Sequence, residues 1–262
     1  MAPADPQTSD PNIADAHTAR PSLKGRKAII TGGTTGIGRA IAVLLASEGV
    51  EIFTGGRSEG DLHEALERIG RVGTGHGIIV DLAQPGELDR FFAAAEEQMS
   101  GYDIAILNAA ITADGLTDMS EAEVRQAIEV DFTGYVLGAH KAVQRMKAVG
   151  SGNIIFTGSY AVHKLGPFST VYAGIKAGIH GFAEALRREV GQDGIKVGMV
   201  VPALTGSDFA KQDMDDEEQA QRIAEETMMR AEDIAVAVHF MLTQPRRATV
   251  QELVMVQRNT DE

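Results

Sequence analysis

Short apolar runs alternate along the chain with longer stretches in which apolar side chains recur every three to four residues. The runs predict buried strands at 28–31, 52–54, 78–80, 104–107, 154–156, 197–201 and 253–256. The periodic stretches predict helices over about 36–48, 61–68, 85–100, 122–148, 171–190 and 232–242, with Pro85 in the first turn of its helix. Strand and helix alternate, and the strands are apolar on both faces. We therefore expect a doubly wound, Rossmann-type α/β fold with a parallel sheet of about seven strands.

Two segments depart from this alternation. Residues 1–22 are rich in Pro, Ala and Asp, which predicts a disordered tail before a single domain over 23–262. They contain neither the basic region nor the apolar region of a secretory signal. The acidic segment 205–230 follows the sixth strand, and a long excursion at that place is typical of a lid over a substrate site. A solvated pair of helices without such a role is the alternative.

Composition narrows the classes of function. The formal net charge of −13 argues against a nucleic-acid partner. The chain has no cysteine, which excludes disulfides, thiolate metal sites and a cysteine nucleophile. Its seven histidines show no ligand spacing, so we expect no metal. No apolar run is long enough to span a bilayer, so we expect no membrane partner and a cytoplasmic protein.

A glycine-rich segment, TGGTTGIG at 31–38, follows the first strand and opens the first helix. Its glycines let the backbone approach a pyrophosphate, and the helix N-terminus offers unpaired N–H groups and the positive end of the dipole. We therefore expect a dinucleotide cofactor here, with a plain tight turn as the alternative. The expected contacts are Gly32, Thr34, Thr35, Gly36, Ile37 and Gly38.

The adenosine end of such a cofactor is read after the second strand. A carboxylate there selects NAD, whereas an arginine favours a 2′-phosphate. Arg57 stands at this place, so NADP(H) is favoured over NAD(H), unless Arg57 is simply a solvated surface residue. Asp81 and Leu82, after the third strand, are expected to hold the adenine, with a strand-end cap as the alternative role of Asp81.

The chemistry is indicated by three residues. Tyr172 and Lys176 lie one helical turn apart, and Ser159 precedes the tyrosine by thirteen positions. The lysine charge favours a tyrosinate and is expected to lower the tyrosine pKa from about 10. A serine hydroxyl can hydrogen-bond a substrate oxygen. Together they can move a proton on and off a carbinol oxygen while a hydride is transferred, although a Tyr-x-x-x-Lys pair alone is common on helices.

In combination, these motifs resemble the short-chain dehydrogenases/reductases, in their compact single-domain branch. The resemblance covers 23–256 and rests on TGGTTGIG (31–38), VDL (80–82), LNAA (107–110), VDFTG (130–134), Ser159, Tyr172 with Lys176, and VPA (201–203).

The resemblance implies roles for these positions. Tyr172 would be the general acid/base, Lys176 would bind the nicotinamide ribose, and Ser159 would position the substrate oxygen. The family also packs as a homotetramer through its two long helices, here about 122–148 and 171–190. Further implied cofactor contacts are Asn108, Ala109 and Ala110 at the fourth strand, and Pro202, Ala203 and Leu204 at the nicotinamide carboxamide.

One departure from the family concerns catalysis. The family's catalytic asparagine, which holds a water of a proton relay through the lysine, is Asp131 here. An ionised aspartate accepts a hydrogen bond from that water but cannot donate as an amide does, and it adds negative charge near Lys176. We expect an active enzyme with altered pH dependence; a catalytically impaired protein is the alternative.

The expected substrate is a small secondary alcohol or its ketone: a polyol, a sugar or a hydroxy acid. Residues 152–157, 240–243 and 254–256 are similar to ribitol/polyol dehydrogenases, and the last stretch also to 3-hydroxy-acid dehydrogenases. Known polyol dehydrogenases favour NAD, which conflicts with Arg57. A dinucleotide-binding sensor or scaffold without turnover is the alternative function. Candidates for lining the substrate pocket are Phe168, Met199, Phe209, Met214 and Met228.

Overall fold

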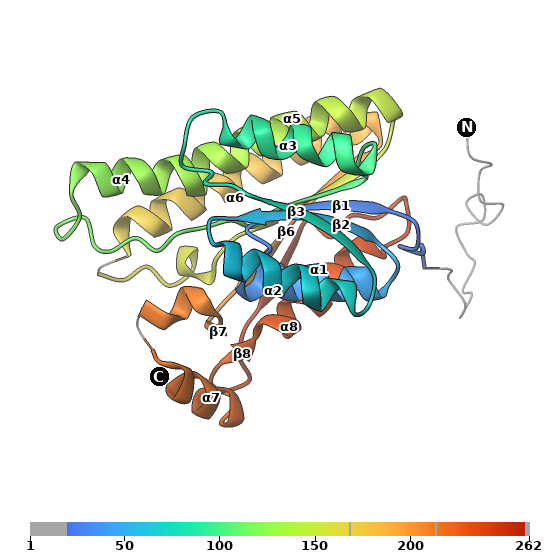
Figure 1. Ribbon diagram of the computed structural model, residues 1–262. Coiled ribbons are helices and arrows are strands. Elements are labelled where there is room, and N and C mark those ends of the chain that lie inside the picture. Colours follow the sequence, from blue (N-terminus) through green and yellow to red (C-terminus); the bar gives the residue numbers. More distant parts are fainter. Residues whose placement is uncertain (1–19, 168, 213, 260–262) are drawn as a thin grey trace, which may run out of the picture.

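A computed structural model describes residues 20–167, 169–212 and 214–259 of the chain. Seven strands form one parallel sheet between two layers of helices (Figure 1), in the order β3-β2-β1-β4-β5-β6-β9. This confirms the predicted doubly wound fold. The strands are β1 (Lys27–Thr31), β2 (Glu51–Gly56), β3 (Thr74–Ile79), β4 (Ile104–Leu107), β5 (Gly152–Thr157), β6 (Ile195–Pro202) and β9 (Glu252–Met255).

Each helical layer covers one face of the sheet (Figure 1). An apolar core lies under each layer: one includes buried side chains of α3, α5 and α6, and the other includes those of α1, α2 and α8. The helices of the two layers are α1 (Gly36–Ser47), α2 (Glu59–Gly70), α3 (Glu87–Met99), α4 (Glu121–Ile128), α5 (Gly134–Val149), α6 (Thr170–Val190) and α8 (Ala231–Leu242).

The strand order reverses direction at β1. This strand pairs in parallel with β2 on one side and with β4 on the other. Because all strands of the sheet are parallel, their carboxyl ends meet at one edge. The loops that leave β1 and β4 diverge there and open a crevice, which is where α/β sheets bind ligands.

Three local expectations were wrong. The helix expected over 122–148 is two helices, α4 and α5, joined by a π-helical turn at Glu129–Thr133 that buries Asp131. Pro85 precedes its helix, because Gly86, with a φ of 82°, is the N-cap of α3. The edge strands β3 and β9 are only partly covered, so they are not apolar and buried on both faces.

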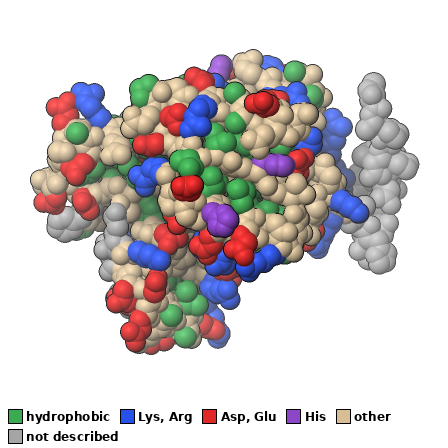
Figure 2. Space-filling view, in the orientation of Figure 1, with side chains coloured by type: hydrophobic (Ala, Val, Ile, Leu, Met, Phe, Trp, Pro, Cys, Tyr) green, Lys and Arg blue, Asp and Glu red, His purple; other side chains and the backbone are tan. Residues whose placement is uncertain are grey.

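The segment after β6 has secondary structure of its own. Two short strands, β7 (Thr205–Gly206) and β8 (Met229–Arg230), pair in parallel at its ends. Between them lie a 3-10 helix (Asp208–Gln212) and α7 (Asp216–Ala224), and Figure 2 shows acidic side chains gathered on this lobe. Residues 1–19 of the expected tail lie outside the described residues. Within the described ranges, no helix is both long and apolar enough to cross a membrane.

Candidate active site

A cavity of about 1290 Å³ lies at the carboxyl ends of the strands and contains residues of both predicted sites. Two of the expected site residues do not line it: Gly38, which is buried in α1, and Asp131, which lies behind the wall. The expected residues that do line it are Gly32, Thr34, Thr35, Gly36, Ile37, Arg57, Asp81, Leu82, Asn108, Ala109, Ala110, Ser159, Tyr172, Lys176, Pro202, Ala203 and Leu204.

The glycine loop owes its shape to the absence of side chains. Gly32 has a φ of 65°, and a Cβ on it would lie 2.8 Å from the Cα of Ala109. A Cβ on Gly38 would lie 2.2 Å from the carbonyl oxygen of Gly32. Because Gly38 has no side chain, the Gly32 carbonyl can pack against α1 on the side away from the cavity. Because Gly32 has none, the backbone of the loop packs directly on the end of β4.

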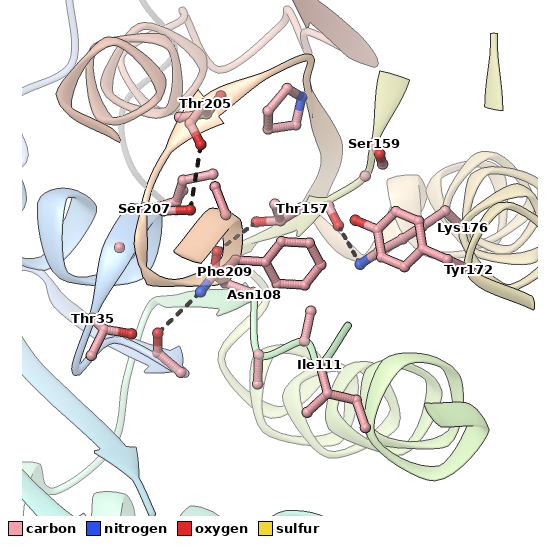
Figure 3. A pocket seen from close by; sticks show the side chains of 18 of the residues that line it. Thr35, Asn108, Ile111, Thr157, Ser159, Tyr172, Lys176, Thr205, Ser207 and Phe209 are labelled. Carbon is pink, nitrogen blue, oxygen red and sulfur yellow. Dashed lines mark hydrogen bonds between the residues drawn. The ribbon is translucent and has the colours of Figure 1, made fainter. Parts of the chain in front are cut away.

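Asn108 joins three strand ends at this place (Figure 3). Its Nδ2 donates to the carbonyl oxygens of Thr31 (3.3 Å) and Gly32 (3.1 Å), and its Oδ1 accepts from the Thr157 hydroxyl at 3.2 Å. The Thr31 hydroxyl accepts from the backbone N–H of Asn108 (2.9 Å) in return. Asn108 thus fixes the floor between the cofactor loop and the end of β5.

The three residues predicted to carry the chemistry meet in the cavity (Figure 3). Ser159 follows β5, and Tyr172 and Lys176 lie on successive turns of α6. The Ser159 hydroxyl accepts from the backbone N–H of Ala161 at 3.2 Å and is close enough to the Tyr172 phenol to lower its pKa. Tyr172 is partly exposed to the cavity, whereas Lys176 is 1% exposed.

The expected lowering of the tyrosine pKa is not found. The pKa of Tyr172 is raised to about 12. Burial is the largest cause, the interaction with the Ser159 hydroxyl opposes it, and the Asp131 charge adds to it. Burial also lowers the pKa of Lys176, against the opposing effect of the Asp131 carboxylate. Loss of solvent around the phenol therefore raises the pKa of Tyr172 by more than the Lys176 charge was expected to lower it.

Asp131 is fully buried in the π-helical turn. Its Oδ1 accepts from the backbone N–H of Ile111 at 2.8 Å, while its Oδ2 is buried and finds no hydrogen-bond partner among the described residues. Burial raises its pKa to about 6, although the Lys176 charge and the Ile111 N–H oppose the change. Asp131 therefore changes charge close to neutral pH.

The sequence reasoning missed two residues of this site, Tyr135 and Thr157. The Thr157 carbonyl accepts from Lys176 Nζ at 3.3 Å, and the Tyr135 hydroxyl accepts from the same ammonium at 3.2 Å. Tyr135 follows Asp131 by four positions on a helical segment, so its spacing carried a signal. Nothing in the sequence distinguished Thr157 from other residues at strand ends.

At the adenosine end, Arg57 is exposed and lines the cavity beside Ser58 and Asp61. Within the described part of the chain it forms no ion pair. Asp81 Oδ1 accepts from the backbone N–H of Ala83 at 3.1 Å, which is the geometry of a turn cap, although Asp81 also lines the cavity.

The segment 205–230 contributes the wall above Tyr172. Phe209 lies with its ring centroid 5.8 Å from that of Tyr172, and Met214 also lines the cavity. Met199 and Met228, two further candidates, are buried instead. Phe168 lies outside the described residues. Within the ranges that the structure covers, no three acidic or histidine side chains are grouped to hold a metal ion.

The fold and the site define an α/β protein with a glycine-rich loop facing a Ser–Tyr–Lys group across one cavity. The family model of the short chain dehydrogenases matches residues 26–236. The chain belongs to this family of oxidoreductases.

Known relatives cover most of the chain. An uncharacterized oxidoreductase of Staphylococcus aureus is 27% identical, and the match covers 89% of this chain and 97% of that protein. The 3-oxoacyl-[acyl-carrier-protein] reductase of Vibrio cholerae is 32% identical, and the match covers 84% of this chain and 91% of that protein. Among solved structures, a short chain dehydrogenase from Burkholderia cenocepacia in complex with NADP is 26% identical, with a TM-score of 0.79 over 90% of this chain and 98% of that one.

Proposed function

We propose that the protein is an NADP(H)-dependent oxidoreductase that interconverts a secondary alcohol and a ketone, with Tyr172 as the general acid/base. The observation that carries the proposal is the convergence in one cavity of the glycine loop, Arg57 and the Ser159–Tyr172–Lys176 group. The NADP complex of the Burkholderia relative supports the choice of cofactor.

The residues present fit a nicotinamide dinucleotide. The glycine loop exposes backbone at the N-terminus of α1, and the Asp208 carboxylate is close enough to the Gly36 N–H for that group to lower its pKa. Arg57 lines the same cavity and forms no ion pair with any described residue, so its guanidinium is available to a 2′-phosphate. Ala203 and Leu204, which follow the carboxyl end of β6, line the cavity together with Tyr172.

The protein's own side chains divide the remaining work. When bound, the reduced nicotinamide supplies a hydride to the carbonyl carbon. Tyr172 donates its proton to the carbonyl oxygen, and its raised pKa keeps that proton in place at neutral pH. The Ser159 hydroxyl orients the same carbonyl oxygen. The buried ammonium of Lys176, one helical turn after Tyr172, holds a positive charge next to the phenol.

The segment 205–230 is proposed as the lid. Phe209 and Met214 give the substrate end an apolar wall against Tyr172. This wall suits a substrate with an apolar part next to its carbonyl more than a small polyol. The similarity to a 3-oxoacyl reductase makes 3-oxoacyl thioesters a second substrate class to test.

The homotetramer that the family resemblance implies stays a prediction.

A substrate panel tests this proposal. Polyols, sugars, 3-hydroxy acids, cyclic ketones and 3-oxoacyl thioesters are each assayed with NADPH and with NADH, following absorbance at 340 nm. We expect turnover of at least one carbonyl with NADPH. Binding of NADPH without oxidation across the whole panel would instead support a dinucleotide-binding sensor or scaffold.

Replacing Arg57 with alanine tests the cofactor preference. Loss of one charge-assisted contact to a 2′-phosphate should lower kcat/KM for NADPH about ten- to a hundredfold and leave that for NADH nearly unchanged. Arg71→Ala is the matched control, since Arg71 lies just after α2 and pairs with Glu67 outside the cavity. Equal losses with both cofactors, or no loss, would show that Arg57 does not read the phosphate.

Asp208 of the proposed lid contacts the glycine loop. Partial burial raises the pKa of Asp208, but Lys211, Arg39 and the Gly36 N–H together hold it below the ordinary value. A carboxylate thus lies where a diphosphate is expected. Asp208→Asn should therefore tighten NADPH binding about two- to fivefold, measured by fluorescence titration. Asp216→Asn is the control, because Asp216 pairs with the same Lys211 but is highly exposed. Unchanged affinity in Asp208→Asn would contradict a competition between lid and cofactor.

A further inference from the structure

A second tyrosine covers Lys176 on a side that the proposed reaction does not use. Tyr135 lies in the first turn of α5, and its ring centroid is 4.6 Å from Lys176 Nζ. The ring of Tyr172 is 5.6 Å from the same atom. Tyr135 and Lys176 are each 1% exposed. The lysine ammonium is therefore enclosed by two phenol rings, and only Tyr172 has a role so far.

The hydrogen bonds around the ammonium form a closed triangle. Lys176 Nζ donates to the Tyr135 hydroxyl (3.2 Å) and to the Thr157 carbonyl (3.3 Å), and the Tyr135 hydroxyl donates to that same carbonyl at 3.4 Å. An ammonium has three N–H donors. Two are held by protein atoms, which leaves one for a partner in the cavity that Lys176 lines.

The charge of this buried lysine is balanced from the same helical segment. Asp131 precedes Tyr135 by four positions, is 0% exposed, and is close enough for each charge to shift the pKa of the other. It raises the pKa of Lys176, against the larger lowering by burial. On α6, His180 also senses the ammonium, and its other charged neighbours are Glu252 of β9 and His163. Of these groups, only Asp131 raises the lysine pKa.

We infer that Tyr135 is a positioning residue for the reaction proposed above. Its hydroxyl fixes Lys176 Nζ below Tyr172, its ring keeps solvent from the lysine, and Asp131 supplies the counter-charge. The inference rests on the proposed function. It also accounts for catalysis with an aspartate at position 131. Lys176 donates a hydrogen bond to the Tyr135 hydroxyl, whereas in the family relay the lysine bonds to a water that the asparagine holds.

The first test replaces Tyr135 with phenylalanine, which keeps the ring and removes the hydroxyl. We expect kcat to fall about tenfold or more with KM within about threefold, because the ammonium loses one of its two protein acceptors. The alkaline limb of the kcat–pH profile should move to lower pH, since the charged lysine is less well held. Tyr102→Phe is the matched control: Tyr102 is buried in the same apolar core, but its ring packs on Phe92 of α3 and not on Lys176. Equal kcat values and pH profiles in the two variants would overturn the inference.

Two measurements keep the test independent of turnover. NADPH affinity should weaken severalfold in Tyr135→Phe and not in Tyr102→Phe, because the third lysine N–H is misplaced; equal affinities count against the inference. The melting temperature of the wild type should fall relative to that of Asp131→Asn as pH rises from 4 to 6, since the raised pKa of Asp131 means that the folded state holds its proton more tightly. Carboxyls with a lowered pKa, such as those of Glu64 and Glu123, act in the opposite direction but equally in both proteins.

Asp131→Asn has no titrating group at this position and should not show this loss. Melting temperatures that change in parallel with pH in the two proteins would show that the Asp131 carboxyl does not titrate beside Lys176, and would overturn its part in the inference even if Tyr135→Phe fails to fold. Should the wild type bind NADPH but reduce nothing in the substrate panel, the proposed function fails, while the affinity and melting series still decide the roles of Tyr135 and Asp131.

Discussion

Tyr172→Phe is expected to lower kcat for carbonyl reduction by about a thousandfold, because a general acid contributes roughly 10²- to 10⁴-fold to such a proton transfer. The ring, and with it the contact to Phe209, is retained. NADPH affinity should therefore stay within about threefold of the wild type. Steady-state kinetics and a fluorescence titration measure the two quantities separately. Undiminished turnover would refute the assignment of Tyr172.

The direction of the reaction sharpens this test. Reduction uses the protonated phenol, which persists across the neutral range because burial raises the pKa of Tyr172 to about 12. Alcohol oxidation needs the tyrosinate, so its kcat/KM should rise with pH between 7 and 10 while that of reduction changes little. The phenylalanine variant should lose the rise. Tyr102→Phe, which removes a hydroxyl from the core, should keep both profiles.

The alternation of apolar runs was sufficient to predict the fold, because a buried parallel sheet requires strands that are apolar on both faces. The same rule failed at β3 and β9, which lie at the sheet edges and are only partly covered. Helical periodicity also ran through the π-helical turn at Glu129–Thr133 without a break, because one extra residue in a turn hardly alters the spacing of apolar side chains.

The candidate site was predictable where short motifs carry the chemistry. The glycine loop and the Tyr172–Lys176 pair depend on local spacing, and the structure brings both to one cavity. The pKa of Tyr172 was not predictable, since it depends on how much solvent the surrounding chain excludes. Tyr135 follows Asp131 by one helical turn, but its contact with Lys176, which lies on a different helix 41 positions away, is formed only in the folded chain.

The glycine loop provides the second large effect. Gly38→Ala places a Cβ 2.2 Å from the carbonyl oxygen of Gly32 and 2.6 Å from Asn108 Nδ2. The carbonyl belongs to the backbone and cannot swing aside as a flexible side chain would. The loop must therefore open, and Asn108 must release its hydrogen bonds to Thr31 and Gly32. Overpacking of this kind costs about 1–3 kcal/mol, so NADPH affinity should fall roughly ten- to a hundredfold.

Gly191→Ala is the control for an added methyl group elsewhere. Gly191 has a φ of −60° at the C-cap of α6, and a Cβ there meets nothing within 4 Å. This variant should bind NADPH as the wild type does and gain up to about 1 kcal/mol in stability, because alanine restricts the unfolded chain. Melting curves taken with and without NADPH separate the two effects: in Gly38→Ala, the cofactor should add much less to the melting temperature than in the control. An equal increase in both variants would mean that the loop tolerates the methyl group, and that its close packing on Asn108 is not what shapes the cofactor site.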